Sequence, residues 1–232
     1  YLASLGYDLI IVGRRKENLL NLKKELKVKV KVMPLDLSEF DNVEELYNEV
    51  KNDDIDILIN NAGFGLFGEF SKTDIETEMK MINVNIKQVH YLTKMFLRDF
   101  IKKDSGYILN VASSAGFMAG PKLSTYYATK NYILKLTEAI YEELRRNKSN
   151  VHISALCPGP VNTEFNKVAH GEFHTKSASS EYVAKYSIDK MFKNKLIIIP
   201  TLRMKLAIFA TRFVPIKTLL KITYNIQDRK TK

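Results

Sequence analysis

Hydrophobic and polar positions follow two different patterns along the chain. Short apolar runs rich in valine and isoleucine are typical of buried β-strands. These runs predict strands at 8–13, 27–35, 55–60, 107–112, 151–157 and 195–200. The run KVKVKVMPL at 27–35 differs from the others because lysine and valine alternate in it, which favours a strand at the edge of a sheet with one face in water.

Longer amphipathic segments separate the apolar runs. Apolar residues at helical spacing predict helices near 16–26, 41–52, 74–102, 124–146 and 180–193. A repeated order of strand and helix is typical of a parallel sheet covered by helices on both faces. We therefore expect an α/β fold with a doubly wound parallel sheet, in a single domain, because no internal repeat or low-complexity linker divides the chain.

The composition agrees with one large core. The 232 residues are 45% hydrophobic and 27% charged, as in ordinary globular domains. The single cysteine, Cys157, rules out a disulfide framework, so we expect a reduced, cytoplasmic compartment. Because Cys157 lies in an apolar run with no histidine near it in sequence, a buried inert thiol is favoured over a nucleophile.

The net charge of +10 is concentrated near the end of the chain. Residues 196–232 hold eight Lys or Arg and one acid, Asp228, which accounts for +7 of the total. The rest is only mildly basic and has no basic helix with interleaved aromatics, so we expect no nucleic-acid partner. We accordingly divide the chain into a catalytic domain at 1–200 and a basic amphipathic extension at 201–232.

The extension carries Leu202, Leu206, Phe209 and Phe213 at the spacing of one helical stripe. A basic amphipathic helix can lie on an anionic membrane surface, which would make the protein peripherally membrane-associated. It can equally close over a substrate pocket or form a subunit contact, and the pattern alone favours this second interpretation.

A Gly-x-Gly-x-x-Gly motif follows the third predicted strand, at Gly63, Gly65 and Gly68. In the dinucleotide fingerprint such glycines open a helix directly, and an acid about 20 residues later binds the ribose. Here the next helix begins only near Thr73 or Asp74, and no acid occupies the later position. We interpret the motif as an ordinary loop after a strand.

Five other motifs occur together: NNAG at 60–63, INVN at 82–85, NVASSAGF at 110–117, STYYATK at 124–130 and CPGPVNTEF at 157–165. Each is weak alone, but together and in this order the chain strongly resembles the short-chain dehydrogenase/reductase family from Tyr1 to about Pro200. The resemblance implies a Rossmann-like domain, a nicotinamide cofactor and a small carbonyl or alcohol substrate, commonly in a homo-oligomer. No metal is expected.

The family pattern chooses between the two adjacent tyrosines. It places three residues between tyrosine and lysine, which selects Tyr126 with Lys130, and a serine thirteen residues before the tyrosine, which selects Ser113. Asn85 matches the asparagine that completes the family's catalytic set and helps to hold a water molecule. Tyr127 is then a packing residue.

This set suits carbonyl reduction, in which a nicotinamide supplies hydride but not the proton. A tyrosine hydroxyl, with an ordinary pKa of about 10, exchanges protons poorly at neutral pH. We expect the ammonium of Lys130, with an oxidised nicotinamide, to lower the pKa of Tyr126, and Ser113 to hydrogen-bond the carbonyl oxygen.

Arginines predict the choice of cofactor. Gly13 stands where NAD-preferring members of the family carry an aspartate, and Arg14 and Arg15 follow it. Because guanidinium groups bind phosphate through paired donors, NADP is expected, although two arginines at a helix start can also be solvated surface charge. The resemblance further implies these cofactor contacts: Asp36 at the adenine, Asn61, Ala62 and Gly63 behind the adenosine, Tyr126 and Lys130, and Pro158, Gly159, Val161 and Thr163 along the nicotinamide.

The first residues depart from the family's fold. Residues 1–6 are typical of the end of a helix that stops at Gly6, whereas a dinucleotide-binding domain begins with a strand and a glycine-rich turn before that helix. We expect that the first strand and phosphate-binding loop are missing from this sequence. In the family that strand is central, between those predicted at 8–13 and 55–60.

Two functions remain open. The first is an NADP-dependent carbonyl reductase or alcohol dehydrogenase that uses Tyr126 as proton donor or acceptor. The second is a catalytically silent NADP-binding or membrane-docked protein of the same fold, against which the intact set of four residues argues. The substrate itself is not predicted, because the loop at about 162–181, expected to line the pocket, has no common pattern in the family.

Overall fold

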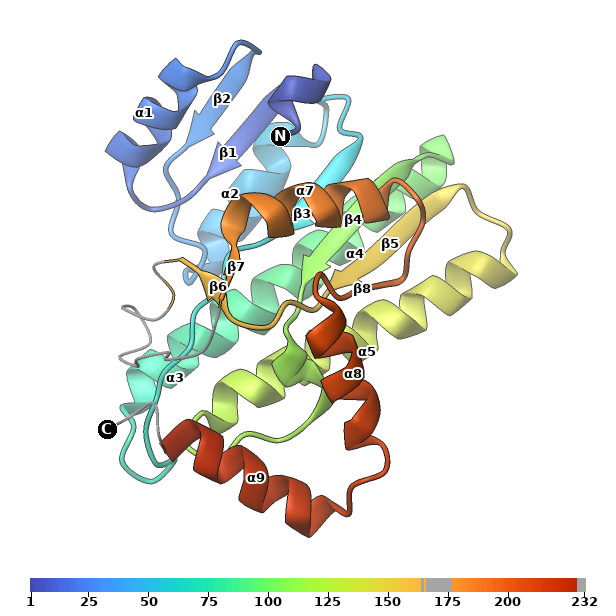
Figure 1. Cartoon of the computed structure of the whole chain (residues 1–232). Helices are drawn as coiled ribbons and strands as arrows, with labels where there is room; N and C mark the ends of the chain where they lie inside the picture. Colours follow the sequence, from blue (N-terminus) through green and yellow to red (C-terminus); the bar gives the residue numbers. More distant parts are fainter. Residues whose placement is uncertain (164, 166–176, 229–232) are drawn as a thin grey trace.

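The computed structural model describes residues 1–163, 165 and 177–228, and its strands and helices alternate as the sequence predicts (Figure 1). Six strands lie within or beside the predicted runs: β1 (Leu9–Val12), β2 (Val30–Met33), β3 (Ile57–Asn60), β4 (Gly106–Val111), β5 (Val151–Leu156) and β8 (Ile197–Ile198). Most are shorter than their runs.

The predicted helices are also confirmed. They are α1 (Lys16–Glu25), α2 (Phe40–Val50), α5 (Ser124–Arg146) and α7 (Ser180–Met191). The segment predicted as one helix at 74–102 consists of α3 (Ile75–Ile82), a π-helical turn η2 (Asn83–Lys87) and α4 (Gln88–Lys103). The shorter elements are η1 (Ala3–Leu5), η3 (Ser114–Phe117), β6 (Val161–Asn162) and β7 (Ala178–Ser179).

All strand pairs in the described residues are parallel. Four strands form one sheet in the order β3-β4-β5-β8, while β1 pairs with β2 alone. The predicted edge position of β2 is confirmed, and its Lys31 Nζ lies 3.1 Å from the carboxylate of Glu49 on α2. Within the described ranges no ladder joins β1 to β3, and a further strand between them stays a prediction.

Helices cover both faces of the four-stranded sheet (Figure 1). Successive strand residues point to opposite faces, so Ile108 packs in the cluster with α2 and α4, whereas Leu109 packs in the cluster with Met191 of α7. Both of these strand side chains are almost fully buried. This two-sided burial explains why the central runs are continuously apolar, and it leaves the carboxyl ends of the strands for polar side chains.

A polar network lies inside this apolar core, near the carboxyl ends of β3 and β4. Asn60 Nδ2 donates to Asn110 Oδ1 at 2.9 Å and to Thr93 Oγ1 at 3.0 Å. Asn110 Nδ2 in turn donates to Thr137 Oγ1 of α5 at 3.1 Å. All four side chains are buried, so the network ties two central strands to α4 and α5 with their polar groups paired.

Replacing Asn110 by alanine is expected to lower the free energy of unfolding by about 3 kcal/mol, because each buried polar partner left unpaired costs about 1–3 kcal/mol. Urea unfolding measures this loss. The exposed Asn48→Ala on α2, which loses only a contact with Lys51, is the matched control and should change stability little. Equal effects of the two substitutions would contradict a structural role for the network.

The extension folds as two helices, α8 (Leu202–Thr211) and α9 (Ile216–Asp228), separated by a turn that contains Pro215. Figure 1 shows them in red, beyond the carboxyl end of the sheet. None of the helices in the described part of the chain is both long enough and apolar enough to cross a membrane. The division of the chain at residue 200 stays a prediction.

Candidate active site

Tyr126 and Lys130 lie on neighbouring turns at the start of α5, as their spacing of four residues predicts. The Lys130 side chain is buried, with only 5% of the residue exposed. Its Nζ donates to the carbonyl oxygen of Val111 at 2.8 Å and lies 5.8 Å from the centre of the Tyr126 ring. The helix therefore brings both side chains to the carboxyl end of β4.

The electrostatics of this pair differ from the expectation. Burial lowers the pKa of Lys130 to about 8. Burial also raises the pKa of Tyr126, although a hydrogen bond with Ser113 opposes the increase. The expected lowering by Lys130 is therefore not seen in the protein alone, because Nζ lies against Val111 and the face of the ring, and desolvation outweighs its charge.

Ser113 is placed beside Tyr126 by the turn that follows β4. It is the N-cap of η3, and its hydroxyl accepts from the backbone N–H of Ala115 at 3.1 Å. Its backbone N–H points to the sulfur of Cys157, while burial raises the pKa of that thiol to about 12. Cys157 is thus a buried, unreactive support for the turn.

Asn85 lies in the π-helical turn η2, and such turns often occur at functional sites. Its Nδ2 donates to the carbonyl of Phe64 at 2.9 Å and to Thr129 Oγ1 at 3.1 Å, and its Oδ1 accepts from the N–H of Phe64 at 3.1 Å. Thr129 donates to the carbonyl of Tyr126 at 2.7 Å. Asn85 therefore fixes the loop after β3 against α5, and only Oδ1 retains capacity for a water molecule.

The glycine motif after β3 forms part of this site. A Cβ on Gly63 would lie 3.0 Å from Asn85 Oδ1 and 3.3 Å from Lys130 Nζ. A Cβ on Gly65 would lie 3.3 Å from the Tyr126 ring. The motif does not open a helix, because α3 begins only at Ile75, but its glycines permit close approach to the site.

Tyr127 packs, as predicted, with its ring edge to face against that of Tyr126 at 6.2 Å between ring centres. Its ring lies over Gly120, where a Cβ would be 2.4 Å from the ring. Its hydroxyl accepts from Gln227 Nε2 of α9 at 2.5 Å, and Lys122 forms an ion pair with Asp228 in the same helix. The second tyrosine therefore anchors the extension.

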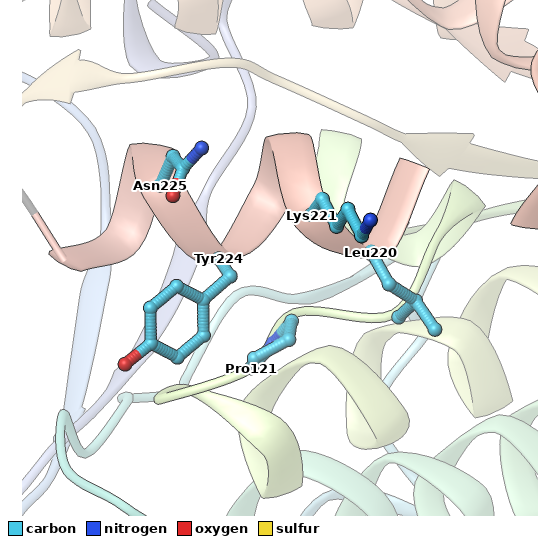
Figure 2. A pocket seen from close by; sticks show the side chains of 5 residues that line it. All are labelled: Pro121, Leu220, Lys221, Tyr224 and Asn225. Carbon is cyan, nitrogen blue, oxygen red and sulfur yellow. The ribbon is translucent and has the colours of Figure 1, made fainter. Parts of the chain in front are cut away.

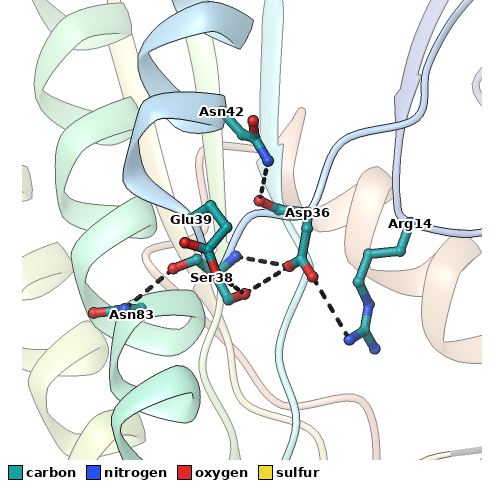
Figure 3. A network of polar contacts seen from close by, with 6 residues as sticks. All are labelled: Arg14, Asp36, Ser38, Glu39, Asn42 and Asn83. Carbon is teal, nitrogen blue, oxygen red and sulfur yellow. Dashed lines mark hydrogen bonds and ion pairs between the residues drawn. The ribbon is translucent and has the colours of Figure 1, made fainter.

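Arg14 and Asp36, which are predicted to bind the adenosine half of the cofactor, meet beyond the ends of β1 and β2 (Figure 3). Arg14 Nη1 lies 4.0 Å from Asp36 Oδ2, and the Arg14 side chain is 70% exposed. Burial would raise the pKa of Asp36, but hydrogen bonds from the backbone and side chain of Ser38, together with Arg14, hold it below its ordinary value. The anionic carboxylate of Asp36 and the accessible guanidinium of Arg14 are thus side by side. Arg15 is the N-cap of α1.

The other predicted cofactor residues line the carboxyl ends of β3 and β5. Asn61 and Ala62 follow β3 directly. The Pro158 carbonyl accepts from the N–H of Ser114 at 2.8 Å, which joins the loop after β5 to the turn that carries Ser113. Val161 pairs with Ala178 in β6 and β7, and Thr163 is exposed beyond them.

Gly159 is a point of close approach, because a Cβ there would lie 2.7 Å from Met204 Cγ of α8. The extension thus packs directly on the loop predicted to contact the nicotinamide. Most of the predicted substrate loop at 162–181 lies outside the described residues.

A groove of about 440 Å³ opens between α9 and the loop before α5 (Figure 2). Pro121, Leu220, Lys221, Tyr224 and Asn225 line it. None of the four predicted catalytic residues is among them, so this groove lies beside the site rather than at the reacting groups.

Sequence patterns missed two residues that support the site. One is Thr129, described above with Asn85. The other is Glu78 of α3, which is buried and accepts from Thr125 Oγ1 at 2.8 Å and from the hydroxyl of Thr73. The sequence gives one indication of Glu78: it is an acid at a position of an amphipathic helix where the spacing predicts an apolar residue.

Comparisons with known proteins show the family of the chain. Residues 1–172 match the sequence pattern of the family described as short chain dehydrogenase. An uncharacterized oxidoreductase of Staphylococcus aureus is 32% identical over 161 residues, which are 68% of this chain and 69% of that protein. One of Staphylococcus epidermidis is 30% identical over 164 residues, 70% of each chain.

Solved structures have the same fold. A short-chain dehydrogenase from Sphingobium yanoikuyae, in complex with NADPH, has a TM-score of 0.81 and 25% identity over 91% of this chain and 87% of its own. A short chain dehydrogenase/reductase from Burkholderia phymatum, in complex with NAD, has a TM-score of 0.80 and 21% identity over 89% and 84%. The chain therefore belongs to the short-chain dehydrogenase family and is an oxidoreductase.

Proposed function

We propose that the protein is an NADP-dependent short-chain dehydrogenase/reductase that interconverts a carbonyl compound and a secondary alcohol. The observation that carries this proposal is the gathering of Asn85, Ser113, Tyr126 and Lys130 at the carboxyl end of β4. These four side chains come from η2, the turn after β4, and α5, which are far apart in sequence.

The proposed roles follow from the geometry. Tyr126 donates its hydroxyl proton to the substrate oxygen as the carbonyl becomes an alkoxide, and the resulting phenolate regains a proton from water. Ser113, hydrogen-bonded to Tyr126, donates to the same oxygen and orients it. The Lys130 ammonium stabilises the phenolate, and Asn85 positions the loop. When bound, the cofactor supplies the hydride that reaches the carbonyl carbon.

The described residues fit a nicotinamide dinucleotide. An ammonium has three donors, and the Lys130 Nζ has one hydrogen-bond acceptor in the described part of the chain, the Val111 carbonyl, so two donors remain for ribose hydroxyls. The exposed Arg14 guanidinium supports binding of a 2′-phosphate and hence NADP rather than NAD. Across residues 1–163, 165 and 177–228, no cluster of His, Cys, Asp and Glu could hold a metal ion.

Turnover of NADPH by the full-length protein with a panel of ketones and aldehydes tests the proposal. Loss of NADPH absorbance with at least one carbonyl, and its abolition in Lys130→Met, is expected. NADPH binding by calorimetry without turnover of any carbonyl would instead favour a catalytically silent binding protein.

The rate of carbonyl reduction should depend on pH through Lys130. Because burial lowers the pKa of this ammonium to about 8, kcat/KM should be level near neutral pH and fall above about pH 8, where the positive charge beside the forming phenolate is lost. The raised pKa of Tyr126 keeps the proton donor protonated over this range. A profile that rises through pH 8 would contradict this assignment.

One observation favours the silent alternative. Without cofactor, burial raises the pKa of Tyr126 instead of lowering it, so its hydroxyl does not readily lose a proton at neutral pH. We retain the catalytic proposal because proton donation in reduction needs the neutral phenol. The proposal includes a homo-oligomer in the cytoplasm.

A further inference from the structure

The extension exposes a row of large apolar side chains, which we call the tail stripe: Leu202, Leu206, Phe209 and Phe213. Their exposed fractions are 70%, 62%, 55% and 73%, and Ile216 at the start of α9 is 64% exposed. Phe209 and Phe213 contact each other edge to face, with ring centres 5.3 Å apart. A contiguous apolar surface of this kind marks an interaction site more often than chance exposure.

The tail stripe points away from the protein. At about 100° per residue along a helix, its four members fall within about 60° of one another. Met204 and Ile208, through which α8 packs on the body, lie on the opposite side, and Ile208 is only 5% exposed. The side chains of the stripe therefore do not close over a pocket in the described part of the chain, whereas the alternative of a subunit contact stays a prediction.

Positive charge flanks the stripe on both sides. Between Thr201 and Gln227 the sequence has five Lys or Arg and no Asp or Glu. Arg203 follows one edge of the stripe, while Lys205 and Arg212 follow the other; Lys205 also reaches the hydroxyl of Tyr186 at 3.2 Å. Among the described residues no carboxylate lies within ion-pair distance of Arg203, Arg212, Lys217 or Lys221.

We propose that the tail stripe and its flanking cations dock the protein on an anionic lipid bilayer. Apolar side chains bordered by Lys and Arg match an acyl interface beneath acidic headgroups. A second copy of the chain would bring together two surfaces that carry only positive charge, which disfavours self-association there. The ten residues of α8 extend for about 15 Å, half the thickness of the hydrocarbon layer, so the helix lies along the surface.

Fluorescence tests this docking directly, because the chain has no tryptophan. A Phe213→Trp variant of the full-length protein should shift its emission to shorter wavelength with mixed phosphatidylglycerol and phosphatidylcholine vesicles. Pure phosphatidylcholine vesicles should produce little shift. The shift should weaken at high salt, since the screening length falls from about 10 Å at 0.1 M to about 3 Å at 1 M.

Two sets of variants separate the apolar and ionic contributions in vesicle co-sedimentation. Phe209→Ser with Phe213→Ser should lower binding at least tenfold. Arg203→Gln, Arg212→Gln and Lys217→Gln together should lower it about a hundredfold, because each basic residue near an anionic surface contributes about fivefold. Phe70→Ser, which removes a phenylalanine that is 68% exposed in the loop before α3 and outside the tail stripe, is the matched control and should bind as the wild type does.

Three outcomes would overturn the proposal. The first is no shift of the tryptophan emission in the Phe213→Trp variant, and no sedimentation of the wild type, with anionic vesicles. The second is equal loss of binding in the Phe70→Ser control and the stripe variants, with circular dichroism verifying their folds. The third is a stripe variant that changes the oligomeric state without changing vesicle binding, which would assign the surface to a second copy of the chain.

Discussion

Replacement of Tyr126 by phenylalanine is expected to lower kcat for carbonyl reduction about 10²- to 10⁴-fold, the range typical of a lost general acid. The variant keeps the ring, which packs 5.3 Å from that of Phe165, but removes the hydroxyl that bonds with Ser113. Cofactor binding should change little, because Lys130 keeps its bond to Val111. Steady-state kinetics and calorimetric titration with NADPH measure the two effects.

Tyr127→Phe is the matched control, since it removes a hydroxyl from the adjacent residue of the same helix. That hydroxyl accepts from Gln227, whereas the hydroxyl of Tyr126 bonds with Ser113, so kcat should fall only slightly. If the Tyr127 variant lost activity and the Tyr126 variant kept it, the assignment of the proton donor would be wrong.

The second large effect concerns the cofactor. Arg14→Asp combined with Arg15→Ala should lower the ratio of kcat/KM for NADPH to that for NADH by about ten- to a hundredfold. A charge-assisted hydrogen bond to phosphate contributes about 1.5–3 kcal/mol, and the new carboxylate would repel the 2′-phosphate. The position of Arg14 beside Asp36, at the predicted adenosine site, supports the choice of Arg14 for substitution.

Lys23→Asp with Lys24→Ala provides the same change of charge on the exposed end of α1 and should leave the cofactor ratio unchanged. A ratio that Arg14→Asp and Arg15→Ala do not alter would mean that both arginines are surface charge. Equal shifts in both double variants would indicate a general electrostatic effect instead of phosphate recognition.

Much of the fold could be predicted because its signals are local. Each buried strand is an apolar run, and the spacing of Tyr126 and Lys130 is a property of one helix. The π-helical turn at Asn83–Lys87 could not be predicted, because one inserted residue leaves the apolar spacing of the flanking helices almost unchanged.

The electrostatics of the site also escaped prediction from sequence. The lowered pKa of Lys130 and the raised pKa of Tyr126 come from burial, which depends on packing of β4, α5 and the loop after β3. Likewise, the hydrogen bond from Gln227 to Tyr127 joins residues 100 positions apart and leaves no periodic signal. The resemblance to the family selects the candidate side chains, whereas their protonation depends on tertiary contacts.

The attachment of α9 to Tyr127 and Lys122 couples the extension to the candidate active site. Helix α5 carries the proposed proton donor on one residue and an anchor of the extension on the next. If binding of α9 to a membrane surface changes the affinity of the site for substrate, then substrate binding must change the affinity for that surface by the same factor. Through the adjacent tyrosines, substrate binding and surface binding are therefore thermodynamically linked.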